Sequence, residues 1–369
     1  MASSSDSSGI EKLIRSDLMS FVGYSARKSP DTLVEKVDIS ADDIVKLDAN
    51  ENPYGCSPRV NQALAVYPYI SVYPDNEQTK LKRLIAEYVG VGAEYIVASN
   101  GSNQLIDLIF RLFVQPGEEV VTCAPSFSMF RFSADICGGR LVEVPRDEEF
   151  AIDMNATKKA INRKTKLILV DNPNNPSGSL SCRSDIIELI NIGLPILVDE
   201  AYFEFAGETV ASLVKRYDNL MVSRSFSKWA GLAGLRIGYG VFPPKIAGYL
   251  QRIKVPYNVS VAAQVAVEES LKDVDYLMGG VRAIIKERDR LFGELGKIKW
   301  LKPFPSQANF ILCSVMAGSA SQLQQDLERR GILVRYFNQP LLKNYVRISV
   351  GKSEHTDALI KALRELGEK

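Results

Sequence analysis

The sequence predicts an α/β protein with two domains: a large one built on a mostly parallel sheet of seven strands between helices, and a smaller α+β domain. From about residue 95 to residue 245, short apolar segments alternate with segments of helical periodicity, which is typical of layered α/β domains. Several of the apolar segments are continuous, as in strands that helices cover on both faces. The pattern changes after residue 262, where a long helical segment comes before separate strand-like segments.

Seven apolar segments of the first region have the length of strands. They are residues 95–98, 119–123, 140–144, 166–170, 195–198, 220–223 and 237–241. Residues 105–113, between the first two segments, carry apolar side chains at helical spacing. A helix in that place is the usual connection between parallel strands.

The second region predicts an α+β arrangement. It has a helical segment at residues 263–295, strand-like segments at 309–313, 332–335 and 346–350, and a closing helix at about 356–366. We therefore expect an N-terminal arm at residues 1–45, a large domain at residues 46–262 and a small domain at residues 263–369.

The composition excludes several classes of protein. The chain has 369 residues, 46% of them hydrophobic and 24% charged, which is ordinary for a globular protein. Its 45 basic and 44 acidic residues give a net charge of +1, which argues against a nucleic-acid partner. No apolar run reaches the roughly 18 residues of a membrane span, so we expect no membrane partner.

Cysteine and histidine content bear on compartment and metal binding. The five cysteines form no C-x-x-C pair, so they predict free thiols in a reducing compartment. The single histidine, His355, excludes a multi-histidine site, and we expect no metal. The serine-rich first nine residues lack the apolar core of a signal peptide. We expect a cytoplasmic protein, or one of an organelle stroma if a transit segment has been removed.

Lys228 is the first candidate for chemistry. It ends the run Ser225-Phe226-Ser227-Lys228, directly after an apolar segment and before a glycine-rich stretch. A desolvated lysine amine can lose its proton and attack a carbonyl to form a Schiff base. Most lysines are solvated surface charges. The interpretation of Lys228 as a reactive amine therefore depends on the motifs upstream of it.

Polar motifs follow the expected strands, and in a parallel sheet sites gather at the carboxyl ends of the strands. Residues 100–103 open a helix whose free N–H groups suit a phosphate, although an ordinary helix cap is the alternative. Residues 171–178 form a tight polar loop, or a plain turn. Asp199 suits a buried cation or caps the next helix, and Arg236 suits a phosphate or a surface ion pair.

Together these motifs resemble the fold type I, class II pyridoxal-phosphate aminotransferases. The ordered set is N-P-N-N-P-S-G at 172–178, V-D-E-A-Y at 198–202, S-F-S-K at 225–228 and G-L-A-G-L-R-I-G-Y at 231–239. Three further motifs are similar to the histidinol-phosphate aminotransferase subfamily: K-L-D-A-N-E-N-P-Y-G at 46–55, Y-P-D at 73–75 and Y-V-R-I-S-V-G-K at 345–352. The resemblance covers about residues 40–365, and seven motifs in order are far more specific than one.

The resemblance implies pyridoxal 5′-phosphate as the cofactor and a role for each matching residue around its ring. Lys228 would hold the cofactor as a Schiff base and later move the proton of the reaction. Asp199 would pair with the ring nitrogen. Tyr202 and Asn175 would bond the phenolic oxygen, and Phe127 would stack on the ring, although a core aromatic is the alternative for Phe127.

The resemblance also implies residues for the phosphate and for the substrate. Those expected around the phosphate are Gly101, Ser102, Asn103, Ser225, Ser227, Arg236 and, from the neighbouring subunit of a homodimer, Tyr73. Arg347 would clamp the anionic end of the substrate, with Arg335 as a second guanidinium, because the planar fork matches carboxylate and phosphate. The alternative for each arginine is a solvated charge at a strand end. Tyr24 and Asn50 are expected to close over the substrate.

The sequence departs from the family pattern in three places, and the first is the N-terminal arm at about residues 24–30, which fits the family poorly. Asn103 and Gln104 stand where the family usually has an acidic pair, and Phe127 stands where it usually has tyrosine. Phenylalanine keeps the aromatic face and loses the hydroxyl. These changes put the identity of the substrate more in question than the chemistry.

The resemblance implies a transaminase of histidine biosynthesis, with a small-molecule amino donor and keto acceptor. It would interconvert histidinol phosphate and 2-oxoglutarate with imidazole-acetol phosphate and glutamate. A threonine-phosphate decarboxylase and an aromatic aminotransferase of broader specificity stay open as alternatives on the same fold. A non-catalytic regulator would need a DNA-binding helix-turn-helix domain, and the sequence shows none.

Overall fold

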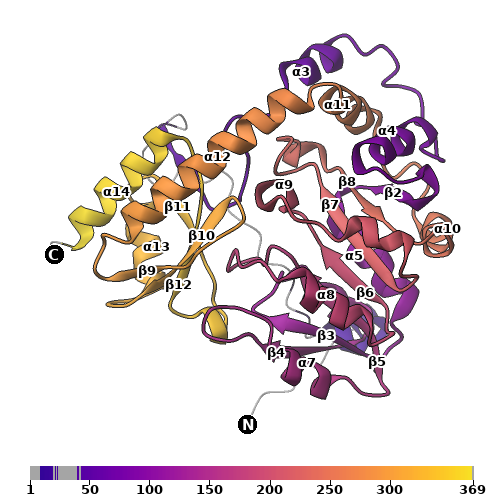
Figure 1. Cartoon of the computed structure of the whole chain (residues 1–369), viewed down its shortest axis with the longest axis horizontal. Helices are drawn as coiled ribbons and strands as arrows, with labels where there is room; N and C mark the ends of the chain where they lie inside the picture. The colour runs from indigo at the N-terminus through magenta and orange to yellow at the C-terminus, as the bar shows by residue number, and fades with distance from the viewer. Residues whose placement is uncertain (1–8, 20, 22, 24–39, 41–42, 368–369) are drawn as a thin grey trace.

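The structure, a computed structural model, describes residues 9–19, 21, 23, 40 and 43–367. A seven-stranded sheet forms the centre of the larger of two lobes, and a five-stranded sheet lies in the smaller lobe (Figure 1). All five cysteines are free thiols. Within the described ranges, no helix combines the length and apolar character that a membrane crossing requires.

The seven-stranded sheet confirms the predicted fold class. Its strands are β2 (Ile96–Ser99), β3 (Glu119–Ala124), β4 (Arg140–Pro145), β5 (Thr165–Asp171), β6 (Ile196–Asp199), β7 (Leu220–Ser225) and β8 (Gly238–Val241). Their order across the sheet is β2-β8-β7-β6-β5-β3-β4, and β8 runs in the direction opposite to the other six strands. Each strand lies within two residues of the segment expected from the sequence.

Both faces of this sheet are buried, which explains the continuous apolar runs. Alternate residues of one strand belong to different cores: Ile168 and Val170 of β5 lie in one hydrophobic cluster, and Leu167 and Leu169 lie in another. The helices of the larger lobe are α3 (Pro58–Ala65), α4 (Thr79–Val89), α5 (Gly101–Phe113), α6 (Met129–Ile136), α7 (Met154–Ala160), α8 (Arg183–Ile190), α9 (Phe203–Ala206), α10 (Pro244–Ile253) and α11 (Val261–Leu271). A short helix, α1 (Ser16–Met19), lies in the N-terminal region.

The smaller sheet contains two strands that the sequence did not predict. Its order is β1-β11-β12-β10-β9, and β1 runs parallel to β11. The strands are β1 (Val45–Leu47), β9 (Leu301–Pro303), β10 (Phe310–Val315), β11 (Ile332–Tyr336) and β12 (Tyr345–Ser349). Strands of three residues such as β1 and β9 are too short to give a periodic signal.

The helices of the smaller lobe also differ in detail from the expectation. The single helix expected at residues 263–295 is two helices, α11 and α12 (Val274–Leu295), which Lys272 and Asp273 separate. Helix α13 (Ala320–Glu328) was not expected, whereas α14 (Ser353–Gly367) matches the closing helix. Periodicity alone did not show the break because apolar residues continue on both sides of it.

The expected domain boundaries stay predictions, but two elements cross them. β1 includes Lys46 and Leu47, which the boundary assigns to the large domain, and it pairs with the smaller sheet. Helix α11 lies beyond residue 262 for most of its length, yet it packs against α3 and α4 of the larger lobe (Figure 1).

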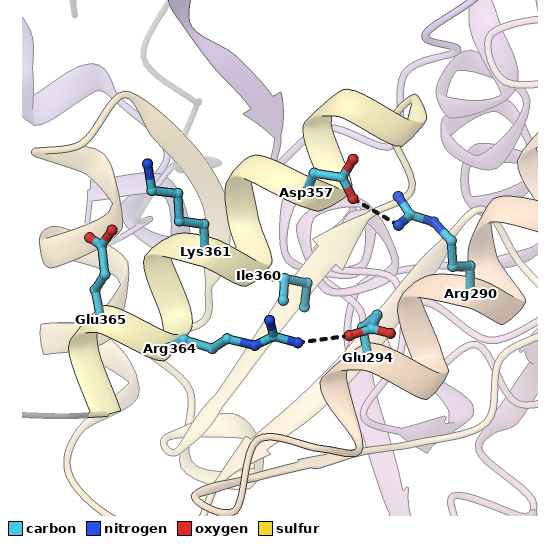
Figure 2. Close-up of a pocket in the computed structure, with 7 residues that line it drawn as sticks. All are labelled: Arg290, Glu294, Asp357, Ile360, Lys361, Arg364 and Glu365. Atoms are coloured by element: carbon cyan, nitrogen blue, oxygen red, sulfur yellow. Dashed lines mark hydrogen bonds and ion pairs between the residues drawn. The ribbon is translucent and has the colours of Figure 1, made fainter.

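A polar groove lies between α12 and α14 (Figure 2). Its volume is about 450 Å³, and charged side chains of both signs line it. Arg290 pairs with Asp357 at 2.8 Å, and Arg364 pairs with Glu294 at 3.0 Å. These partly exposed ion pairs connect the two helices, and each contributes little to stability because water screens it.

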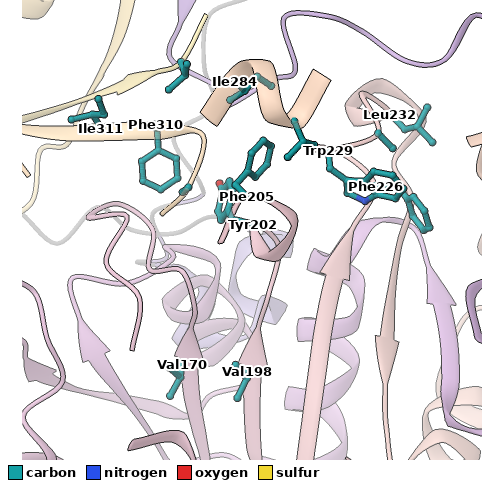
Figure 3. Close-up of a cluster of buried hydrophobic side chains, with 14 of the residues drawn as sticks. Val170, Val198, Tyr202, Phe205, Phe226, Trp229, Leu232, Ile284, Phe310 and Ile311 are labelled. Carbon is teal, nitrogen blue, oxygen red and sulfur yellow. The ribbon is translucent and has the colours of Figure 1, made fainter. Parts of the chain in front are cut away.

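A cluster of aromatic side chains fills the junction between the lobes (Figure 3). The Phe310 ring of β10 packs edge-on against the Tyr202 ring, with 5.1 Å between centroids. Phe226 and Trp229, on either side of Lys228 in the sequence, are fully buried and pack on each other. The loop that carries Lys228 is therefore fixed by large apolar side chains.

Candidate active site

A cavity of about 160 Å³ opens at the carboxyl ends of the parallel strands. Ten of the residues expected from the sequence line it: Ser102, Asn103, Phe127, Asn175, Asp199, Tyr202, Ser225, Ser227, Lys228 and Arg236. Ala49, Asp171, Pro173 and Ala201 complete the lining. The topology explains the convergence, because parallel strands bring their carboxyl ends to one edge of the sheet.

Lys228 reaches the cavity from the loop after β7. Its Nζ donates a hydrogen bond to the Ala49 carbonyl at 3.0 Å. Close backbone packing holds the loop: Gly231 has φ +67, and a Cβ there would lie 2.2 Å from the Gly55 carbonyl oxygen. Any other residue at position 231 would push this loop away from the segment that supports the lysine.

Asp199 ends β6 and lines the cavity. Its Oδ1 accepts from the Ala201 N–H at 3.2 Å and from the Ser223 hydroxyl at 3.1 Å. No described residue donates to Oδ2. Burial, and then the neighbouring Asp171, raise the pKa of Asp199 to about 7. A cation in the cavity, such as a protonated ring nitrogen, would stabilise the ionised form of this buried carboxylate.

Tyr202 and Asn175 lie at the side of the cavity that faces the smaller lobe. Asn50 donates from Nδ2 to the Tyr202 hydroxyl at 2.9 Å. Asn175 Oδ1 accepts from Arg347 Nη1 at 2.7 Å. A phenolic oxygen between Tyr202 and Asn175 would meet a hydroxyl and an amide, both of which can donate.

The opposite end of the cavity has the features of an anion site. Helix α5 begins at Gly101, and the side chain of Asn100 does not cap it. Gly101 has φ +74, and a Cβ there would lie 2.7 Å from Arg236 Nη2, so only glycine lets the guanidinium approach the helix start. Free N–H groups of the helix and this cation together suit a phosphate. The cavity as a whole therefore fits a phosphorylated pyridine that carries an aldehyde.

Comparison with known proteins agrees with this geometry. The family model described as Aminotransferase class I and II matches residues 42–363. A Dehalococcoides mccartyi protein named histidinol-phosphate aminotransferase is 50% identical over 359 residues, which cover 97% of this chain and 99% of that protein. The chain belongs to the class I and II aminotransferases. The predicted family is thereby confirmed.

Two further relatives extend the comparison of this aminotransferase. A tobacco (Nicotiana tabacum) protein named chloroplastic histidinol-phosphate aminotransferase is 43% identical, over 96% of this chain and 86% of that protein. The crystal structure of histidinol-phosphate aminotransferase from Sinorhizobium meliloti, described as a complex with pyridoxal-5′-phosphate, superposes with a TM-score of 0.84. It is 28% identical and covers 93% of this chain and 96% of its own.

Several expected site residues do not line the cavity of the aminotransferase. Arg347 contacts it through Asn175, and Asn50 lies behind Tyr202. Arg335 faces Arg347 across the pair of strands β11 and β12, over the ring of Phe337. Their expected roles toward the substrate stay predictions.

Tyr73 and Tyr24 are the two remaining residues that the sequence predicted at the site. Tyr73 is 79% exposed and stacks on Tyr257, away from the cavity of its own chain. That position leaves its expected role in a partner subunit as a prediction. Tyr24 lies outside the described residues.

Three contributors to the site were not predicted from the sequence. Gln104, noted only as a departure from the family, accepts at Oε1 from the Asn100 N–H and from Asn258 Nδ2, both at 2.8 Å, and so supports the start of α5. Ala49 contributes only a carbonyl, which carries no side-chain signal. Asp171 ends its strand as Asp199 does, and that shared position could have pointed to it.

Proposed function

We propose that the protein is a pyridoxal-phosphate-dependent histidinol-phosphate aminotransferase of histidine biosynthesis. It interconverts histidinol phosphate and 2-oxoglutarate with imidazole-acetol phosphate and glutamate. The observation that carries the proposal is the position of Lys228 and Asp199 on one cavity, at the carboxyl ends of β7 and β6. Relatives that share this name over nearly the whole chain favour transamination over the decarboxylase alternative.

The cofactor brings the electron-withdrawing ring and the aldehyde that the chemistry requires. Asp199 Oδ2 would hold the ring nitrogen in its protonated form. The start of α5, Arg236 and the hydroxyls of Ser225 and Ser227 would hold the phosphate. Asn175 and Tyr202 would bond the phenolic oxygen, and Phe127 would cover one face of the ring.

Lys228 has two tasks in this proposal. Its amine would hold the cofactor covalently. When free, Nζ would take the proton from the α-carbon of the substrate and deliver it to the cofactor carbon that carried the aldehyde. The side chain is only partly exposed and is held by the Ala49 carbonyl, which limits where Nζ can travel.

Arg347 is the proposed anchor for the anionic group of the substrate. It is 2% exposed, and the rings of Phe310 and Phe337 flank its guanidinium at 5.1 and 5.7 Å. Arg335 faces it in register on the neighbouring strand. Two guanidiniums at one edge of the site suit a dianionic phosphate as well as a carboxylate.

A homodimer with shared active sites also belongs to the proposal. Large apolar side chains are exposed around residues 66–73 and 249–257, among them Val66, Ile70, Tyr73 and Val255. Tyr73 stacks on Tyr257 and so joins the two segments, and an exposed apolar surface of this kind marks an interface. The free thiols fit a reducing compartment, so we place the enzyme in the cytoplasm or an organelle stroma.

A cofactor-binding experiment tests the proposal. The purified protein is loaded with pyridoxal phosphate and reduced with borohydride, and peptide mapping should find the label on Lys228. Lys228→Ala should bind the cofactor without a covalent link and lose turnover, whereas the matched control Lys299→Ala, at an exposed position, should keep both. Label on another lysine, or full turnover in Lys228→Ala, would reject the assignment.

Half-reactions separate the substrate alternatives. Glutamate alone should shift the absorption of the bound cofactor if the enzyme is a transaminase, and histidinol phosphate should do so at lower concentration than phenylalanine. Release of CO₂ from threonine phosphate without a shift by glutamate would favour the decarboxylase. Equal efficiency with phenylalanine would favour the broader aromatic aminotransferase.

A further inference from the structure

A second buried carboxylate lies beside Asp199. Asp171 is the last residue of β5 and pairs in register with Asp199, the last residue of β6. Asp171 is 3% exposed and lines the same cavity. Nothing in the proposed function assigns it a role, although a buried charge is costly unless it is well bonded.

Four donors surround the carboxylate of Asp171. Its Oδ2 accepts from the backbone N–H of Phe127 at 3.1 Å and of Asn175 at 2.9 Å. Its Oδ1 accepts from Asn174 Nδ2 at 2.8 Å and from Arg146 Nη2 at 3.4 Å. Two oxygens with two donors each use the full accepting capacity of a carboxylate.

Arg146 balances the charge and ties the carboxylate to the sheet. Its side chain is 1% exposed, and it donates from Nε to the Cys123 carbonyl and from Nη1 to the Phe150 carbonyl, both at 3.1 Å. It directly follows β4, and Cys123 belongs to β3. The pair therefore connects the ends of three neighbouring strands. Burial raises the pKa of Asp171, and the Arg146 guanidinium opposes that rise.

The two backbone bonds reach the two loops that border the cavity. Phe127 is the residue expected to cover the ring, and Asn175 is the residue expected to bond its phenolic oxygen. Each loop takes its position from a hydrogen bond to the same carboxylate oxygen. An ion pair with a purely structural role would have no reason to hold these two residues together.

We propose that Asp171 is a positioning residue of the cofactor site, whose carboxylate, balanced by Arg146, holds Phe127 and Asn175 at the spacing that the cofactor ring requires. The inference rests on the proposed function, since it gives Phe127 and Asn175 their contacts with the ring. Asp171 acts through these two residues.

The test is the dissociation constant of pyridoxal phosphate for the apoprotein, measured by equilibrium dialysis. Asp171→Asn keeps the shape but replaces one accepting oxygen by a donor, so it loses two of the four bonds. We expect the dissociation constant to rise about tenfold, the effect of losing a charge-assisted hydrogen bond. The control Asp153→Asn also changes a carboxylate that accepts a backbone N–H, at the start of α7, and should bind as the wild type does.

A second variant and a second measurement keep the outcome decisive. The double variant Asp171→Asn with Arg146→Met removes both charges and should regain thermal stability relative to Asp171→Asn alone, yet still bind the cofactor weakly. The pH at which the absorption of the bound cofactor changes should also differ from the wild type in both Asp171 variants. If Asp171→Asn does not fold, the dissociation constant of the cofactor from the double variant tests the positioning role.

The results separate the two proposals. A wild-type protein that binds no pyridoxal phosphate would reject the proposed function. A wild-type protein that binds it, with variants that share its dissociation constant and its absorption titration, would reject the positioning role alone. A lower melting temperature with unchanged cofactor binding would leave Asp171 and Arg146 as a structural ion pair.

Discussion

Arg347 of the smaller lobe donates to the side chain of Asn175 in the larger lobe, with 2.7 Å between Nη1 and Oδ1. Its Nη2 donates to the Asp48 carbonyl at 2.8 Å. The guanidinium is thus held flat at the junction of the lobes, next to the cavity. An anionic substrate group would approach a cation whose orientation is already set, which lowers the entropy lost on binding.

Arg347→Ala should weaken the binding of anionic substrates. The lost contact is charge-assisted and worth about 1.5–3 kcal/mol, so we expect KM to rise roughly tenfold to a hundredfold. Arg347→Lys should recover only part of this, because lysine keeps the charge and loses the fork. Arg364→Ala, in the exposed pair with Glu294, is the control. Unchanged Michaelis constants for histidinol phosphate and glutamate would remove Arg347 from the substrate site.

Asp199→Asn should leave the fold intact and slow the reaction. An amide cannot keep the ring nitrogen of the cofactor protonated, so we expect kcat to fall by at least about a hundredfold, the scale of losing one preorganised electrostatic group. Ser223→Ala removes one hydrogen bond to Oδ1 and keeps the charge, so its effect should be smaller. Steady-state rates and thermal melting measure the two effects, and an Asp199→Asn enzyme as fast as the wild type would contradict the role.

Tyr73 should act on the active site of the partner subunit. Lys228→Ala and Tyr73→Ala proteins are each expected to be nearly inactive. After mixing, unfolding and refolding, half of the dimers should pair one of each, and each such dimer restores one complete site. Activity should then return to about a quarter of the wild-type level. Subunits mixed without exchange give the baseline, and no recovery would mean that Tyr73 does not serve the partner.

Glu204 should make the folded state less stable as the pH rises. Burial raises its pKa to about 8 from the ordinary 4.5, and the Arg224 guanidinium opposes the rise. The folded protein therefore keeps a proton that the unfolded chain has released, and stability falls between pH 4.5 and about 8. Glu204→Gln should flatten this part of the profile, by at most about 1.4 kcal/mol per pH unit for one proton. Urea unfolding at several pH values tests it, with the exposed Glu208→Gln as control.

The sequence predicted the larger sheet better than the smaller one, for a physical reason. A strand such as β5 is buried on both faces, and its continuous apolar residues give a strong local signal. β1 has three residues, and only its pairing with β11 makes it a strand. A strand that exists through a distant partner has no local signature.

The same distinction applies to the site. Lys228, Asp199 and Arg236 belong to motifs of fixed residue type, so the resemblance could assign them. The Ala49 carbonyl, and the donors that Phe127 and Arg146 direct to Asp171, are brought to the site by the fold from segments distant in the chain. Asn174 and Asn175 donate to Asp171 from its own loop. Asn50 shows an intermediate case: its motif predicted a place at the site, and the structure adds the bond to Tyr202.

Residues 45–52 connect an early part of the chain to a late one. Asn50 and Ser349, 299 residues apart, bond to each other through backbone and side chain, and the neighbouring Ala49 carbonyl accepts a hydrogen bond from Lys228. On the ribosome this segment emerges near the start of synthesis, whereas β11 and β12 emerge near the end. Until then β1 has no partner strand, and the segment whose Ala49 carbonyl accepts from Lys228 is not held by Ser349. A nascent chain of this enzyme should therefore acquire cofactor affinity only after translation has almost finished.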